Sequence, residues 1–246
     1  NSKEKHAPLR DRRYAFEGIK VADFAWVGVG PIMGKYLADH GASVIRIESR
    51  ARPDILRQAP PWADGEPGLD RSQFFASFNT SKHGITLDLS KPKAQELAKK
   101  LVAWADVAIE SFTPKAMRNW GLDYENLRKI NPELIMLSTC QQGQTGPHAL
   151  YPGFGNLMAS LTGFYYISGW PDRDPAPPYG AYTDFIAPRF GATALMAALD
   201  YRRRTGKGQY IDCSQVEPGI YMTGTALLDS LINKRPSERT GNRSPN

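Results

Sequence analysis

The sequence predicts an α/β protein with a Rossmann-like, mostly parallel sheet and flanking helices. Two observations indicate this class. Short apolar runs alternate with segments of helical periodicity, and the first such helix has a proline at its start and a glycine at its end. The chain has 246 residues, of which 41% are hydrophobic and 23% charged. This length and composition suit a globular protein with a substantial core.

The first strand and helix lie near the N-terminus. Residues 19–24 form an apolar run that predicts a buried strand, and residues 44–48 predict the next strand. Between them, Pro31 stands where a first helical residue would, and Gly41 stands where the helix ends. A strand, helix and strand of this length predict parallel pairing with a right-handed crossover.

The alternation continues along the rest of the chain. Ser90 can cap a helix with one apolar face. A long helix over residues 190–203 would bury Leu195 and Met196. The other predicted elements are a strand at 107–110, a helix at 124–130 and a strand at 134–139.

Composition and charge argue against several classes of protein. No window approaches about 18 uninterrupted apolar residues, so we expect no membrane span. Residues 1–16 are charged and predict a basic N-terminal arm rather than a secretory signal. The net charge is +6, but the basic residues are scattered and do not line one helix face, so we expect no nucleic-acid partner. The charge suits an anionic, phosphate-bearing cofactor or a simple solvated basic surface, and charge alone does not separate the two. Cys140 and Cys213 cannot form a disulfide framework, which favours a cytoplasmic setting, and no histidine shows metal-ligand spacing.

Two long loops interrupt the alternation, at residues 50–77 and 169–182. The second loop delivers Asp184, a single carboxylate in an otherwise apolar and aromatic segment. An acid in such a place must be solvated, paired or used for chemistry. The simpler alternative is that Asp184 only caps the helix that follows.

The loop Gly28-Val29-Gly30 lies between the first strand and helix, where α/β folds bind phosphates and nucleotides. Glu48 ends the next strand, and its spacing matches the acid that binds ribose in nicotinamide enzymes, so an NAD-dependent dehydrogenase is a rival interpretation. The glycine fingerprint is incomplete, however, because the third glycine falls one position late, at Gly34, and Pro31 removes an N–H group. A tight structural turn is the other alternative.

Two segments, AYTDFIAPRFG around Asp184 and RRRTGKGQYIDCSQVE at 202–217, resemble the class III coenzyme A transferases. This CaiB/BaiF-type family, which is formyl-CoA transferase-like, also contains the alpha-methylacyl-CoA racemases. Four further segments match the family in order: DFAWVGVGPIMGKYLADHGASVIRIES, FFASFNTSKHGITLDL, IESFTPKAMRNWGL and STCQQGQTGPH. The resemblance implies the large domain of an interlocked homodimer, or of a complex of two related subunits. Members continue past a segment like GNRSPN, so we expect residues 17–246 to be a CoA-binding catalytic domain without the family's small domain and glycine-rich loop.

The resemblance also places a set of residues beside coenzyme A. The family usually has Asn where this chain has Ser111, and often a basic residue where it has Ser49, so both contacts are altered. Arg50 or Arg52 could pair with a phosphate. The expected CoA-binding residues are Val27, Gly28, Ser49, Arg50, Arg52, Asn79, Lys82, Leu87, Ser111, Phe112, Arg118 and Asn119.

By the same resemblance, Asp184 is the nucleophile that attacks an acyl-CoA, and the reaction passes through mixed anhydrides and an aspartyl-CoA thioester. Phe154, Gly155 and Tyr182 would line the substrate side, and the aromatic rings would exclude water. The racemase branch needs a histidine base where this chain has Phe154, which favours transfer over racemisation. An acyl-CoA racemase or epimerase, a non-catalytic CoA-binding subunit and a dehydrogenase are the alternatives. The acyl groups stay undecided between a dicarboxylate such as succinate and a bulky aromatic acid.

Overall fold

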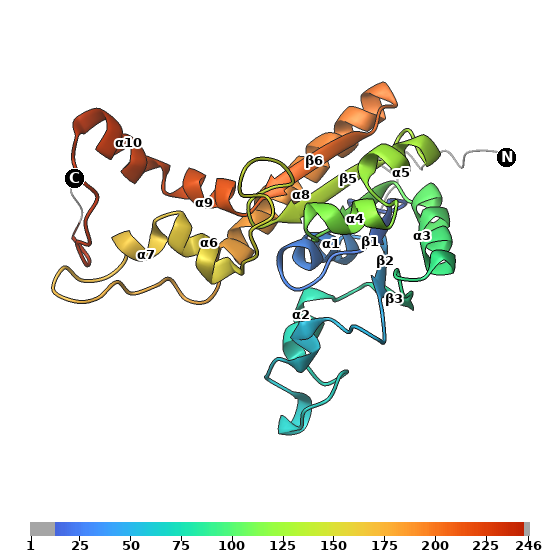
Figure 1. Ribbon diagram of the computed structural model, residues 1–246, viewed down its shortest axis with the longest axis horizontal. Coiled ribbons are helices and arrows are strands. Elements are labelled where there is room, and N and C mark those ends of the chain that lie inside the picture. The colour runs from blue at the N-terminus through green and yellow to red at the C-terminus, as the bar shows by residue number, and fades with distance from the viewer. Residues whose placement is uncertain (1–12, 244–246) are drawn as a thin grey trace.

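A six-stranded parallel sheet forms the centre of the part of the protein that the structure describes (Figure 1). This structure is a computed structural model, and it describes residues 13–243. The strands run in the order β3-β2-β1-β4-β5-β6. They are β1 (Lys20–Asp23), β2 (Ser43–Glu48), β3 (His83–Thr86), β4 (Val107–Glu110), β5 (Ile135–Cys140) and β6 (Gln209–Ser214).

Helices cover both faces of the sheet, and each face has its own apolar core. Side chains alternate along each strand, so Val21 enters one core while its neighbour Ala22 enters the other. The first core includes Met33 and Leu195, from the helices α1 (Val29–Asp39) and α8 (Tyr182–Thr205). The second core is closed by α3 (Pro92–Trp104), α4 (Pro114–Asn119) and α5 (Tyr124–Ile130).

The strand register brings the carboxyl ends of the strands to one edge of the sheet. Val21 of β1 is paired with Val44 of β2 on one side and with Val107 of β4 on the other. The chain order therefore reverses between β1 and β4. In open α/β sheets, the crevice at such a reversal is the usual place for a ligand.

The remaining helices lie outside this three-layer body. Figure 1 shows α6, α7, α9 and α10 projecting to one side of the sheet. The helices α9 and α10 form what we call the apolar arm, residues 216–233, and α10 has no buried residue. The outlying elements are η2 (Ile55–Gln58), η3 (Ala63–Gly65), α2 (Gln73–Phe78), α6 (Gly155–Leu161), α7 (Phe164–Ile167), α9 (Val216–Met222) and α10 (Gly224–Asn233).

The fold class and the predicted strands are confirmed, and several predicted details are wrong. The long helix begins at Tyr182 rather than at residue 190, so Asp184 lies in its first turn. Met196 is 47% exposed, whereas Leu195 is buried as predicted. Lys91 rather than Ser90 is the N-cap of α3, since the Ser90 hydroxyl donates to Asp88 instead.

The loop predicted at residues 50–77 also contains more structure than expected. It includes η2 and η3, and α2 begins in it with the Ser72 hydroxyl accepting a hydrogen bond from the backbone N–H of Phe75. The edge strand β3 was not predicted. Residues 1–12 of the predicted basic arm lie outside the described residues, and Phe16 packs against the first core. Within residues 13–243, no helix is long and apolar enough to cross a membrane, and no cluster of His, Cys, Asp or Glu could hold a metal ion.

Candidate active site

A cavity of about 220 Å³ lies at the carboxyl edge of the sheet, beside the point where the strand order reverses. Its walls come from the segments that follow β1, β4, β5 and β6, together with the starts of α6 and α8. We call it the Asp184 cavity. Residues separated widely along the chain meet there, among them Trp26, Ser111, Gln141, Phe154, Asp184 and Gln215.

Asp184 is mostly buried in the wall of this cavity. Burial raises the pKa of its carboxyl group from 3.8 to about 6, because the charged form loses its hydration. The amide Nε2 of Gln215 donates a hydrogen bond of 2.6 Å to Asp184 Oδ1, which lowers the pKa and offsets part of that effect. At neutral pH the carboxylate is therefore ionised but poorly solvated, which is the state of a carboxylate nucleophile.

Two glycines allow the backbone to approach this carboxylate closely. A Cβ atom on Gly155 would lie 2.5 Å from Asp184 Oδ1, and one on Gly28 would lie 3.5 Å from Asp184 Oδ2. Thr183 holds Gly155 in place, because its hydroxyl donates to the Gly155 carbonyl over 3.0 Å. Gly28 is the N-cap of α1 and has no side-chain cap, so the positive end of the α1 dipole lies beside the carboxylate.

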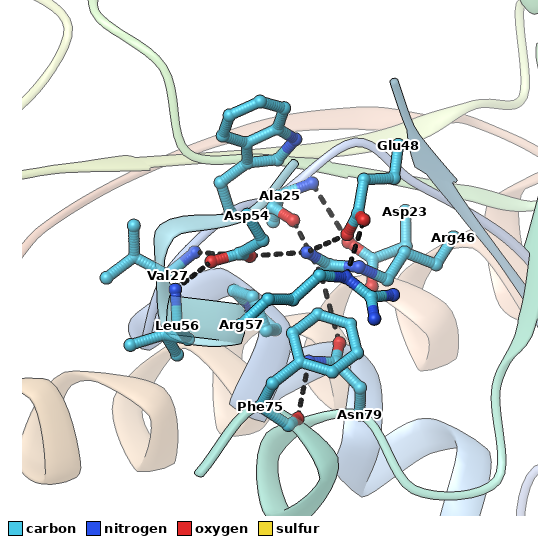
Figure 2. Close-up of polar contacts among 12 residues, drawn as sticks. Asp23, Ala25, Val27, Arg46, Glu48, Asp54, Leu56, Arg57, Phe75 and Asn79 are labelled. Atoms are coloured by element: carbon cyan, nitrogen blue, oxygen red, sulfur yellow. Dashed lines mark hydrogen bonds and ion pairs between the residues drawn. The ribbon is translucent and has the colours of Figure 1, made fainter. Parts of the chain in front are cut away.

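The loop after β1 has an unusual backbone that a buried acid holds in place (Figure 2). Val27 has φ of 64°, a left-handed conformation that is strained for a β-branched residue. Asp54 is fully buried and accepts a hydrogen bond of 3.0 Å from the Val27 N–H. Its carboxylate also accepts from the Leu56 N–H over 2.9 Å and pairs with Arg46 over 2.5 Å. Asp54 therefore fixes the wall of the Asp184 cavity from behind.

Arg46 connects this loop to the neighbouring segments (Figure 2). Its guanidinium donates to the Ala25 carbonyl and to Asn79 Oδ1, both over 2.9 Å. Glu48 accepts a hydrogen bond of 2.6 Å from Arg57, which also lies 3.7 Å above the Phe75 ring. The Glu48 carboxylate thus forms ion pairs with Arg46 and Arg57. These pairs argue against the role of binding a nicotinamide ribose, which its position at the end of the strand suggests.

A second and larger cavity, of about 390 Å³, adjoins the first, and we call it the outer cavity. Trp26 lines both cavities and so marks where they meet. The Phe112 and Trp120 rings meet edge to face at 5.2 Å in its wall, and Arg52 is another of its lining residues. Aromatic faces suit a nucleobase, and an arginine suits a phosphate.

The predicted site residues fall into three groups. Those in the wall of the Asp184 cavity are Val27, Gly28, Ser111, Phe154, Gly155 and Asp184. Those in the outer cavity are Ser49, Arg52, Leu87 and Phe112. Those in neither wall are Arg50, Asn79, Lys82, Arg118, Asn119 and Tyr182.

Lys82 shows why some of these residues lie elsewhere. Its side chain is only 2% exposed, and Nζ donates to Asp23 and to the Pro31 carbonyl, both over 2.8 Å. It also donates to Asn79 over 3.0 Å. Burial lowers the pKa of Lys82, against the opposing charge of Asp23. The Lys82 ammonium thus ties β3 to β1 and α1 rather than lining a cavity.

Ser111 has a similar structural contact, although it lines the Asp184 cavity. Its hydroxyl accepts a hydrogen bond of 2.7 Å from the Trp26 N–H and donates one of 3.1 Å to the Trp26 carbonyl.

Arg118 and Tyr182 lie away from both cavities. Arg118 lines a third cavity beside Glu110, and Tyr182 packs edge to face on Phe164 at 5.0 Å. Burial raises the pKa of Glu110 to about 7, and its carboxylate accepts from the Phe112 N–H over 2.7 Å.

Sequence reasoning missed Trp26 and Gln215. Both lie just past the carboxyl end of a parallel strand, Trp26 after β1 and Gln215 after β6. That position was the available signal, because side chains at such ends face the ligand crevice. For Gln215 the signal is weaker, because residues 209–214 mix polar and apolar side chains and do not mark the end of a strand clearly.

The fold and the site together define a parallel α/β protein with a buried, ionisable carboxylate at the topological switch point. The family model described as CoA-transferase family III matches residues 16–246. The chain belongs to that family.

Similarity to individual proteins agrees with this assignment. The chain is 36% identical over 240 residues to succinate–glutarate CoA-transferase of Agrobacterium fabrum, covering 97% of this chain and 60% of that protein. It is also 36% identical over 203 residues to the beta subunit of succinyl-CoA–L-malate CoA-transferase of Chloroflexus aurantiacus, covering 81% and 49%. A crystal structure of a CaiB/BaiF family protein from Brucella suis has a TM-score of 0.88 at 34% identity, covering 96% and 62%. The chain thus spans less than two thirds of the length of these relatives.

Proposed function

We propose that this protein transfers coenzyme A from an acyl-CoA donor to a carboxylic acid acceptor, with Asp184 as the covalent nucleophile. The observation that carries the proposal is the Asp184 carboxylate, desolvated in a cavity that joins a larger aromatic-walled one. The names of the relatives, which are CoA-transferases, support the reaction class.

The two cavities suggest how coenzyme A would bind. The adenosine part would occupy the outer cavity, against the Phe112 and Trp120 rings, with Arg52 near a phosphate. The pantetheine chain would pass Trp26, which belongs to both walls. The thioester would then reach Asp184 across the backbone of Gly28.

The chemistry needs no outside reagent. The Asp184 carboxylate attacks the acyl-CoA carbonyl, the carbon–sulfur bond breaks, and a mixed anhydride and CoA thiolate result. The thiolate attacks the aspartyl carbonyl, which releases the donor acid as a carboxylate and leaves an aspartyl-CoA thioester. An acceptor carboxylate repeats these steps in reverse order and takes the CoA away.

An anhydride hydrolyses readily, so the site has to exclude water. Phe154 and Tyr151 stand in the wall of the Asp184 cavity, but Phe154 is 61% exposed in this chain alone. The backbone N–H groups at the start of α1, beside Asp184, would stabilise an oxyanion on the substrate carbonyl. The Asp184 cavity has no histidine in its described wall, and transfer requires none.

We further propose that a second copy of the chain, or a related subunit, covers the apolar arm. Seven large apolar residues of the arm are at least 42% exposed: Ile220, Tyr221, Met222, Leu227, Leu228, Leu231 and Ile232. An exposed apolar surface of this kind marks an association site. One relative, as its name states, is the beta subunit of a transferase that also has an alpha subunit. The donor we favour is a dicarboxylic acyl-CoA such as succinyl-CoA, after the names of the relatives.

The test is trapping of the covalent intermediate. The full-length protein is mixed with succinyl-CoA, quenched with hydroxylamine or borohydride, and its peptides are analysed by mass spectrometry. We expect modification of the peptide that contains Asp184, and none in the Asp184→Ala variant. Modification that persists in the variant would remove Asp184 as the nucleophile. Exchange of the α-proton of an acyl-CoA in heavy water, without any adduct, would instead indicate a racemase.

A further inference from the structure

The two oxygens of the Asp184 carboxylate have different surroundings. Oδ1 accepts the 2.6 Å hydrogen bond from Gln215 Nε2 and faces Gly155. Oδ2 faces Gly28, on the side of the β1–α1 loop where the thioester would arrive, and accepts no hydrogen bond from the residues the structure describes. One oxygen is therefore held and the other is open to a substrate.

The backbone of Gln215 is fixed independently of its side chain. Its N–H donates to the carbonyls of Cys140 and Gln141, over 3.0 Å and 3.2 Å, which ties the turn after β6 to the end of β5. The side chain is buried, with the residue only 3% exposed. Within residues 13–243 the amide oxygen Oε1 has no hydrogen-bond partner, so the contact with Asp184 is the only hydrogen bond of the side chain.

Burying an amide with its oxygen unpaired opposes folding. The reverse orientation of the amide would place two acceptor oxygens in contact and lose the one bond that exists. The side chain thus serves Asp184 rather than the fold. We propose that Gln215 is a catalytic residue that donates to Asp184 Oδ1 and stabilises the oxyanion formed there, leaving Oδ2 as the attacking atom.

The role of Gln215 rests on the proposed function, and it follows from the movement of electrons in the proposed transfer reaction. Oδ2 attacks the acyl carbon and becomes the bridging oxygen of the anhydride, while the thiolate leaves with the electron pair of the carbon–sulfur bond. When the thiolate sulfur then attacks Asp184 Cγ, the carbonyl electron pair moves onto Oδ1. The Cγ–Oδ2 bond next breaks, the Oδ1 carbonyl forms again, and the acid departs as a carboxylate carrying Oδ2. No proton is transferred in these steps.

The acceptor half of the reaction also attacks Cγ, so the charge develops on Oδ1 twice in each turnover. A donor placed on that atom before the reaction stabilises the transition state more than the ground state, because the charge is concentrated on one oxygen only at the tetrahedral stage. The two steps at the acyl carbon of the substrate do not use it. Gln215 is thereby specific to attack on the aspartyl carbon.

The first experiment measures how fast the aspartyl-CoA thioester appears after the full-length protein is mixed with succinyl-CoA, by rapid quenching and intact-protein mass spectrometry. In Gln215→Leu we expect this rate to fall by about 10²- to 10³-fold, the usual effect of losing one oxyanion donor. The KM for succinyl-CoA should change little, because the outer cavity is untouched. Gln58→Leu, at an exposed position of η2, is the matched control and should keep the rate of the unmodified protein.

A second variant tests donation directly, even if Gln215→Leu folds poorly. In Gln215→Glu the new carboxyl group can donate only when it is protonated, and a carboxyl pair in contact shares one proton. We expect low activity at neutral pH that rises on acidification. The unmodified enzyme should lose activity as pH falls through about 6, where Asp184 is protonated.

Four outcomes decide the matter. Thioester formation at the normal rate in Gln215→Leu would overturn the role of Gln215, and so would a Gln215→Glu pH profile that follows that of the unmodified enzyme. If the unmodified protein itself forms no thioester with any acyl-CoA, the transferase proposal fails, and the role of Gln215 fails with it. Slow formation in Gln215→Leu together with recovery of Gln215→Glu on acidification would establish the donor.

Discussion

At the residue scale, Asp184 carries its charge at a cost to folding. Its pKa is about 6 in the folded protein against 3.8 in a solvated chain, because burial disfavours the carboxylate. A folded-state pKa above the unfolded value means that the unfolded state gives up its proton first as pH rises. The penalty is therefore absent below about pH 3.8, grows between 3.8 and 6, and is fully present above 6.

Asp184→Asn should consequently stabilise the protein at pH 8 while it abolishes transfer. The shift corresponds to about 3 kcal/mol at most, and incomplete burial reduces the expected gain in unfolding free energy to about 1–3 kcal/mol. Denaturant unfolding at pH 8 and at pH 4 measures it, and the difference should disappear at pH 4. Asp174→Asn, at an exposed position, is the control and should have no such pH dependence. A gain that is equal at both pH values would contradict the explanation.

Gly155 is the second residue of interest, because the lack of a side chain at this position leaves room for the Asp184 carboxylate. In Gly155→Ala the new Cβ would lie 2.5 Å from Asp184 Oδ1 and 2.7 Å from the Cβ of Ala181, so the carboxylate has to move. Displacement of a reacting group by about 1 Å can cost 10²-fold, and we expect kcat to fall by about that factor. Gly84→Ala is the matched control, because nothing lies within 4 Å of the added atom. Steady-state kinetics of both variants decide it, and a Gly155→Ala kcat within twofold of normal would refute the expectation.

At the element scale, the β1–α1 loop depends on Asp54, which accepts from Val27 and pairs with Arg46. Asp54→Asn keeps the shape but removes the charge, so that among residues 13–243 Glu48, at 3.5 Å, becomes the one remaining acidic partner of the buried Arg46. Breaking a buried ion pair from one side typically costs about 3–5 kcal/mol. The amide also has one acceptor oxygen where the carboxylate has two, so either the Val27 N–H or the Leu56 N–H loses its acceptor. We expect that loss in unfolding free energy, with a lower kcat/KM.

The matched control for Asp54 is Asp64→Asn, since Asp64 is 86% exposed in its pair with Arg71. An exposed pair contributes about 0–1 kcal/mol, so this variant should unfold almost normally and keep its activity. Denaturant unfolding and steady-state kinetics compare the two substitutions. Equal stability of the two variants would show that Asp54 does not hold the loop.

The helices were predictable from the sequence where residues at their own ends mark them. The helix after β1 was predicted from Pro31 and Gly41. It begins at Val29, two residues before Pro31, and Gly41 has the positive φ, 101°, that a helix end requires. The helix α8 was predicted to start too late, and it contains Pro188, a residue that disfavours a helix interior. Proline at that position leaves the carbonyl four residues earlier, that of Asp184, without its helical hydrogen bond. Tertiary packing of Ala187 and Leu195 in the first core outweighs this local loss.

At the scale of the whole molecule, the apolar arm predicts association. Leu231→Glu would place a charge in the proposed interface, where burying a leucine side chain contributes about 1.5–3 kcal/mol. We expect the dissociation constant to rise at least about tenfold, measured by light scattering during gel filtration. The control is Leu97→Glu on α3, at a position that is 42% exposed and outside the arm. A monomer at all concentrations for the unmodified protein, or an unchanged dissociation constant in Leu231→Glu, would refute the interface.

The sequence by itself determined the parallel α/β class, because hydrophobic periodicity and helix ends are local signals. It also marked Asp184 as a lone acid in an apolar segment, whereas its role as nucleophile was implied only by the family resemblance. Only the tertiary structure decided which side chains surround that acid. Asp184 and Gln215 are 31 positions apart, and Val27 and Asp54 are 27 apart. Lys82, which the resemblance places near the cofactor, pairs with Asp23 across 59 positions. Contacts at such separations depend on the order and register of the strands, which the pattern of a single sequence does not specify.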